Sequence, residues 1–336
     1  SLREGHGAGR ELQEIRRRVI RQKGGAGFME NPISRSLPDV SMDSVFTEVM
    51  HNEKLGVRNP EQLRLFRLQV SNNAFIYTSL EDYLTDIISE YVFSRAQIEK
   101  LSQPGVGNPR SIGNKALRVM KRNGAANQKG TGNELGEILL YAFLEEKLNA
   151  PKIFSKVELN AGTTPFGTAC DSVHLLDLGD DTGMSYYQTV FGTSDSEGDI
   201  ADAIDSAFDA IVRIENENGN GIQFVDNRSL NDSFDGDVVD KLKSIIIPKP
   251  GAPVANDRAY GVFLGYSLGL DPHTRSTPEF LKDLGTKMDT DIKNHAVYIA
   301  DKIKTLGLDT HSFYFYIVPF NDAKLDKKQV MENLLM

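Results

Sequence analysis

The sequence predicts an α/β protein in which helices flank a mixed central sheet. Apolar residues recur at helical spacing in three segments, residues 133–148, 198–214 and 277–307. Runs rich in β-branched and aromatic residues predict strands at 152–159, 167–176, 184–191, 259–268 and 312–320. One helix precedes three strands, and helices then alternate with single strands. This order is typical of a sheet covered by helices.

The composition is that of a soluble globular protein. The 336 residues can build one large domain or two ordinary ones, and 40% of them are hydrophobic and 25% charged. No apolar run of about 18 residues is present, so no membrane span is predicted. The only cysteine, Cys170, excludes an internal disulfide and a cysteine-rich zinc site, and fits a reducing cytoplasm.

Charge divides the chain unevenly. Residues 1–28 hold seven Lys or Arg and three Glu, so that the rest of the chain, with a total of −9, carries −13. We interpret 1–28 as a leader or as sequence added for expression, with the natural start at Met29; a basic helical arm is the alternative. A mixed N-terminal region with a basic helix is predicted at 29–130, and an α/β core at 131–336.

The N-terminal region is predicted to contain a strand, a helix and a basic segment. Imperfect alternation indicates a strand within 61–72. Ser79, followed by Asp82, has the spacing of a capping box and predicts a helix from there to about residue 101. After the break at "GVGNP" comes a positively charged stretch that could bind phosphates without reading bases. The basic residues of this stretch are Arg110, Lys115, Arg118, Lys121 and Arg122. A solvated helix, or a surface for an acidic partner, is the alternative.

Two acidic residues of the core are candidates for a metal site. Glu137 shares one face of the 133–148 helix with Glu134, and Asp171 lies within an otherwise apolar strand-like run. Carboxylates that converge from a helix and a strand could hold the divalent cation that phosphodiester cleavage requires. The plainer interpretation is that the glutamates are solvated helix residues and Asp171 is an acid at a strand edge.

Four short motifs, in order, resemble a known family. "NELGEILLYAFL", "SKVEL", "ACDSVHLL" and "VFGTSDSEGDIADAIDSAF", within residues 131–215, are similar to HamA, the small subunit of the Hachiman anti-phage defence pair, and to the related AbpA. The resemblance implies a PD-(D/E)xK nuclease-like core and a helicase partner of superfamily 2, HamB. It also implies contact with DNA and Mg²⁺ or Mn²⁺ as the cofactor.

The resemblance carries the catalytic pattern over only in part. The helix glutamate falls on Glu137 and the strand aspartate on Asp171, whereas the Glu-x-Lys pair falls on Thr193 and Asp195, in what reads as a Gly-rich turn. An aspartate cannot replace a cation, although Asp195 could act as a displaced metal ligand beside Glu137 and Asp171. Lys156, on the preceding predicted strand, could supply the missing cation. The alternative is a degenerate nuclease fold that binds and regulates the helicase.

Two other motifs are weak candidates. "GYSLG" places Ser267 in the pattern of a serine-hydrolase elbow, but the turn-forming residues that follow argue against the helix that the elbow needs. His174 is three residues from Asp171, and in a strand this spacing directs the two side chains to opposite faces. No histidines have the spacing of zinc ligands.

Overall fold

A computed structural model describes residues 32–336 except 106, 123–131, 162–169, 181–182 and 218–226. The predicted segment 1–28 therefore lies outside the described residues. Residues 32–336 belong to one compact unit.

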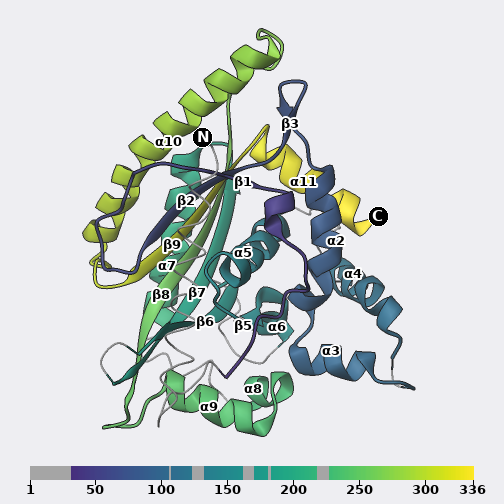
Figure 1. The fold of residues 1–336 in the computed structure, drawn as a ribbon, viewed down its shortest axis with the longest axis vertical. Helices are drawn as coiled ribbons and strands as arrows, with labels where there is room; N and C mark the ends of the chain where they lie inside the picture. Colours follow the sequence, from purple (N-terminus) through teal and green to yellow (C-terminus); the bar gives the residue numbers. More distant parts are fainter. Residues whose placement is uncertain (1–31, 106, 123–131, 162–169, 181–182, 218–226) are drawn as a thin grey trace, which may run out of the picture. The chain divides into compact units, whose positions relative to one another are not determined.

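A seven-stranded mixed sheet runs through this unit, in the order β1-β2-β9-β8-β7-β6-β5 (Figure 1). The three central pairs, β2 with β9, β9 with β8 and β8 with β7, are parallel, and the outer pairs are antiparallel. The bounds of its strands are β1 Thr47–Val49, β2 Gln62–Arg67, β5 Lys152–Ser155, β6 Ser172–Gly179, β7 Ser185–Glu197, β8 Val254–Ser267 and β9 Ser312–Phe320. The predicted mixed sheet flanked by helices is confirmed. A separate two-stranded sheet pairs β3 (Val70–Ser71) with β4 (Ala74–Phe75).

Helices cover both faces of the large sheet. On one face, α5 (Glu134–Glu146) packs on β7 and β8, and α2 (Thr78–Val92), α4 (Ile112–Arg122) and α11 (Ala323–Leu335) lie around it. On the other face, α7 (Ile200–Glu217) packs on the same two strands, beside α10 (Thr277–Thr305). The smaller helices are η1 Met42–Ser44, α3 Arg95–Ser102, η2 Pro109–Ser111, α6 Lys156–Ala161, α8 Asn227–Ser233 and α9 Gly236–Ile246.

Two glycines let α5 lie directly on the sheet. A Cβ at Gly192 of β7 would lie 2.9 Å from Leu140 Cδ2, and one at Gly261 of β8 would lie 2.7 Å from Leu144 Cδ2. Glycine inside a strand often marks a close approach to the strand, and here the leucine side chains of α5 fill the space. Further along α5, Phe143 stacks on Tyr316 of β9 with ring centroids 5.0 Å apart. This contact fixes the helix that carries Glu137 against the centre of the sheet.

The strand predicted at 152–159 is wrong in its second half. The chain leaves β5 after Ser155 and turns at once into α6. Ser155 N–H donates to Glu158 Oε2 (2.9 Å), and Glu158 N–H donates to Ser155 Oγ (3.4 Å). These reciprocal bonds form a capping box, whose signature is visible in "SKVE". Lys156 is therefore the first residue of a helix and not part of a neighbouring strand.

The predicted turn at Gly192 is also wrong, because β7 continues through it. Residues 185–197 pair in parallel register with 254–266 of β8 without interruption. The parallel partner keeps "GTSD" extended, and the turn follows only after Glu197. Asp171, in contrast, lies just before β6 and not inside a strand.

The predicted helix at 79–101 is two helices, α2 and α3. The capping box is at Ser94 and Gln97, where α3 begins, whereas α2 begins without a side-chain cap. The expected box at Ser79 and Asp82 is therefore wrong, because the chain is already helical from Thr78. The strand expected within 61–72 is present as β2.

Candidate functional site

Glu137 lies in the first turn of α5, where this helix approaches the end of β7. Its neighbour Gly136 makes this approach possible, since a Cβ there would lie 3.2 Å from both Cβ and Oγ of Ser194. Tyr91, from the last turn of α2, donates its hydroxyl proton to Glu137 Oε2 at 3.0 Å. The hydrogen bond from α2 thus holds the Glu137 carboxylate in place.

Asp171 is buried and receives three hydrogen bonds. Ser194 donates to Asp171 Oδ2 through its backbone N–H (2.7 Å) and its hydroxyl (2.8 Å). The ammonium group of Lys156 lies 3.1 Å from Asp171 Oδ1, and it also donates to the carbonyl oxygen of Cys170 (3.1 Å). Charge-assisted bonds of this kind fix the position of the carboxylate.

The charge of Asp171 is close enough to affect the protonation of Glu137. Burial, and then the negative charge of Asp171, raise the pKa of Glu137 above its ordinary value, while the Lys156 ammonium acts in the opposite direction. Lys156, although partly buried, has its pKa raised by Asp171 and Glu137 and so stays charged. The folded chain therefore brings three of the predicted residues, Glu137, Asp171 and Lys156, into one cluster.

Thr193 and Asp195 point away from this cluster. Side chains alternate along a strand, and Ser194 faces α5, so its two neighbours face α7. Asp195 accordingly forms a hydrogen bond with Ser206 of α7, and burial raises its pKa. Thr193 is buried. The position that faces Asp171 belongs to Ser194, the residue between the two that the family pattern indicates.

Sequence reasoning missed Ser194, Tyr91 and Lys327. Lys327 of α11 is buried and donates to the carbonyl oxygen of Ser196 and to Asn133 Oδ1, both at 2.7 Å. Next to Asn133 in the chain, Glu134 has a buried Oε2 without a hydrogen-bond partner among the described residues. Only the capping box at Ser155 could have indicated how Lys156 enters the site; the others depend on long-range packing.

Of the three predicted metal ligands, only Glu137 and Asp171 share one cluster. Among the described residues, no group of three or more His, Cys, Asp or Glu side chains is arranged to hold a metal ion. Mg²⁺, however, is commonly bound by one or two carboxylates, water and substrate phosphate instead of a closed protein cage. Asp195, the third predicted ligand, faces the opposite side of the sheet.

The basic residues predicted to bind phosphates lie on α4 and just before it. Ile112, Ala116 and Met120 are the buried side of this helix. Arg118, Lys121 and Arg122 are exposed, as is Arg110 in η2, and Lys115 is half-buried. Among the described residues none of the five has an ion-pair partner. Because Gly113 of α4 lies beside Ser89 of α2, the basic helix packs near the turn of α2 that carries Tyr91.

The other candidates have structural roles. Ser267 is the last residue of β8 and is followed by non-helical residues; its hydroxyl oxygen accepts from the N–H of Ala323 at the start of α11 (2.9 Å). The helix that a nucleophile elbow needs is not there. His174 is buried, with Nδ1 2.8 Å from the carbonyl oxygen of Ala150. None of the helices that the structure describes is both long and apolar enough to cross a bilayer.

Comparison with known protein families gives a match over most of the chain. The family model described as HamA matches residues 43–334, which include α5, β6, β7 and the cluster around Asp171. No curated protein and no solved structure matches the chain.

Proposed function

This chain belongs to the HamA family and is therefore a subunit of Hachiman-type antiviral defence, and we propose that it acts there as a metal-dependent DNA nuclease in complex with a helicase. One observation carries the proposal: Glu137, Asp171 and Lys156 converge from a helix, a strand entrance and a second helix. The cluster supplies two of the three acids and the lysine of the family's catalytic pattern, whereas Thr193 stands at the position of the third acid.

Each residue has a distinct part in the proposed site. Glu137 and Asp171 would hold the cation, which would neutralise charge at the scissile phosphate and activate a water molecule. Ser194 fixes Asp171, and Tyr91 fixes Glu137. Lys156 supplies the positive charge that the Thr193-x-Asp195 sequence lacks, and it does so from α6 instead of β7. The bases of α4 would contact DNA phosphates.

A specific observation favours a second candidate, a degenerate nuclease fold that binds and regulates the helicase. Both carboxylate oxygens of Asp171 already have partners, and the positions of the family's Glu-x-Lys pair face α7. On this alternative the cluster is a structural ion pair, and defence depends on surfaces elsewhere.

Plasmid degradation in Mg²⁺ distinguishes the two candidates. Wild type, Glu137→Gln, Asp171→Asn and the control Asp195→Asn are compared, each with and without the helicase, after thermal melts show that all four are folded. For the nuclease, the first two substitutions lower the cleavage rate at least ~100-fold, and the control does not. If wild type does not cleave under any of these conditions, and Asp171→Asn still protects cells from phage, the regulatory candidate replaces it.

A further inference from the structure

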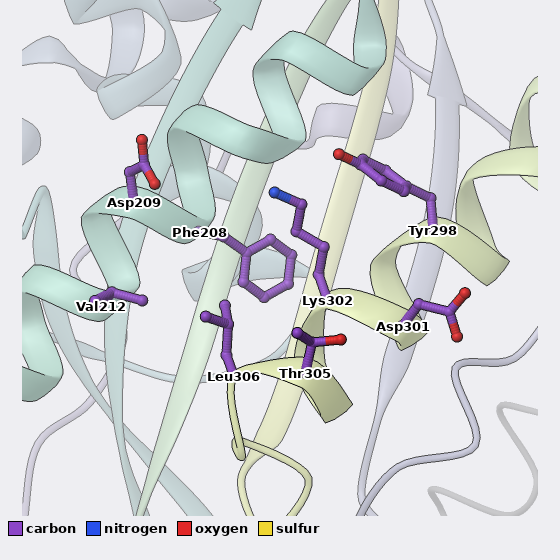
Figure 2. Close-up of a pocket in the computed structure, with 8 residues that line it drawn as sticks. All are labelled: Phe208, Asp209, Val212, Tyr298, Asp301, Lys302, Thr305 and Leu306. Carbon is purple, nitrogen blue, oxygen red and sulfur yellow. The ribbon is translucent and has the colours of Figure 1, made fainter.

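A cleft lies between α7 and α10 (Figure 2). It is on the face of the sheet that α7 covers, opposite the face covered by α5 with Glu137. Its volume is about 300 Å³, which is at the lower limit of small-molecule pockets. Phe208 and Val212 of α7 and Leu306, which follows α10, give it an apolar floor. Leu306 remains 41% exposed. A cleft of this size and openness fits a few side chains better than a whole cofactor.

Acidic residues flank this floor on both sides. Asp209 lies on the α7 side and Asp301 on the α10 side, and in Figure 2 both carboxylates point outward from Phe208. Both side chains are exposed, and among the described residues neither has an ion-pair partner. An apolar centre with a charged rim is the usual anatomy of a protein–protein interface.

One side chain that lines the cleft, Lys302, is positively charged and already has partners. The ammonium group of Lys302 lies 2.5 Å from Asp205 Oδ1 and 5.4 Å from the ring centroid of Tyr298, whose hydroxyl donates to the same carboxylate. A carboxylate beside an aromatic ring is a suitable environment for a positive charge. Lys302 neutralises Asp205, and so the two rim carboxylates are left for a partner.

We propose that this cleft docks a protein segment in which an apolar side chain is flanked by basic residues. The apolar side chain would pack over Phe208, Val212 and Leu306, and the bases would meet Asp209 and Asp301. Charge complementarity of the rim would set the association rate and exclude acidic partners. The sheet separates the cleft from the Glu137 cluster, so a partner bound here leaves that site and α4 open. That this partner is the helicase subunit rests on the proposed function.

Binding of the purified helicase to the fluorescently labelled full chain tests the proposal. The test variants are Asp209→Lys/Asp301→Lys, which reverses the rim, and Leu306→Asp, which places a charge on the floor. The control, Glu99→Lys/Asp240→Lys, makes the same change of charge at exposed residues of α3 and α9. We expect both test variants to raise the Kd at least 10-fold, and the control to change it less than 3-fold. Melting curves verify that all variants are folded.

The outcomes separate this inference from the proposed function. If wild type binds the helicase and the cleft variants bind equally well, the cleft is not the docking surface, while the proposed partnership stands. If the control weakens binding as much as the rim reversal, the effect is one of net charge and the inference fails. If wild type does not bind at all, the partnership itself is wrong, and the inference falls with it.

Discussion

Lys156 Nζ lies 3.1 Å from Oδ1 of Asp171, although the two residues are 15 positions apart and neither lies within a strand. The ion pair is largely shielded, with side-chain exposures of 15% and 12%. It depends on the chain turning from β5 into α6 at Ser155, because only this turn directs the lysine toward the start of β6. The lysine of the proposed site thus comes from the N-terminus of α6.

We predict that the Lys156–Asp171 pair is strongly coupled in stability. Lys156→Met leaves a buried carboxylate without its cation, a change that typically costs ~3–5 kcal/mol. Asp171→Asn leaves a buried ammonium and should also destabilise. The double variant should lose less than the sum of the two single variants, as measured by urea unfolding. Additive losses would mean that the ion pair does not form.

Ser172 and Gly192 are predicted to show opposite tolerance to substitution. A Cβ at Gly192 would lie 2.2 Å from Ser172 Oγ, so Gly192→Ala should cost ~1–3 kcal/mol through overpacking. Ser172 Oγ is buried without a hydrogen-bond partner, and Ser172→Ala should therefore be neutral or stabilising. Combining the two should recover part of the loss in thermal melts. A Gly192→Ala protein as stable as wild type would contradict the close packing of β6, β7 and α5.

The pH dependence of stability should report on His174. Burial lowers the pKa of this imidazole from 6.5 to about 4. Between these values the unfolded chain binds a proton that the folded chain does not, so the free energy of unfolding falls as pH drops from about 6.5 to 4. The pKa difference corresponds to a loss of ~3 kcal/mol. His174→Gln should flatten this part of the curve measured by urea unfolding, whereas His273→Gln, at an exposed position, should leave it unchanged. Identical slopes for wild type and His174→Gln would contradict the prediction.

The basic face of α4 should determine how DNA binding depends on salt. Each phosphate contact contributes about −0.9 to the slope of log K against log salt concentration on duplex DNA. Lys121→Glu/Arg122→Glu should therefore make the slope shallower by about 2 in fluorescence anisotropy. Lys241→Glu/Lys304→Glu reverses two other exposed lysines, on α9 and α10, and serves as the control. Equal slopes for both double variants would place DNA contact elsewhere.

The prediction of fold class from sequence depended on periodicity, which is a local property. Helical spacing predicted α5, α7 and α10, and aromatic runs predicted β8 and β9, because these elements bury one face or two whatever their partners are. The predicted ends of strands were wrong where a partner strand or a helix cap determined them. β8 extended β7 through "GTSD", and the capping box at Ser155 ended β5.

The sequence by itself named Glu137, Asp171 and Lys156 as candidate site residues, and the order of four short motifs indicated the family. Only the tertiary structure decided which side chains meet. The alternation of β7 directs Ser194 toward Asp171 and turns Asp195 toward α7. Contacts between residues far apart in the chain, such as Tyr91 with Glu137, arise from the packing of whole helices on a sheet, which no short sequence pattern specifies.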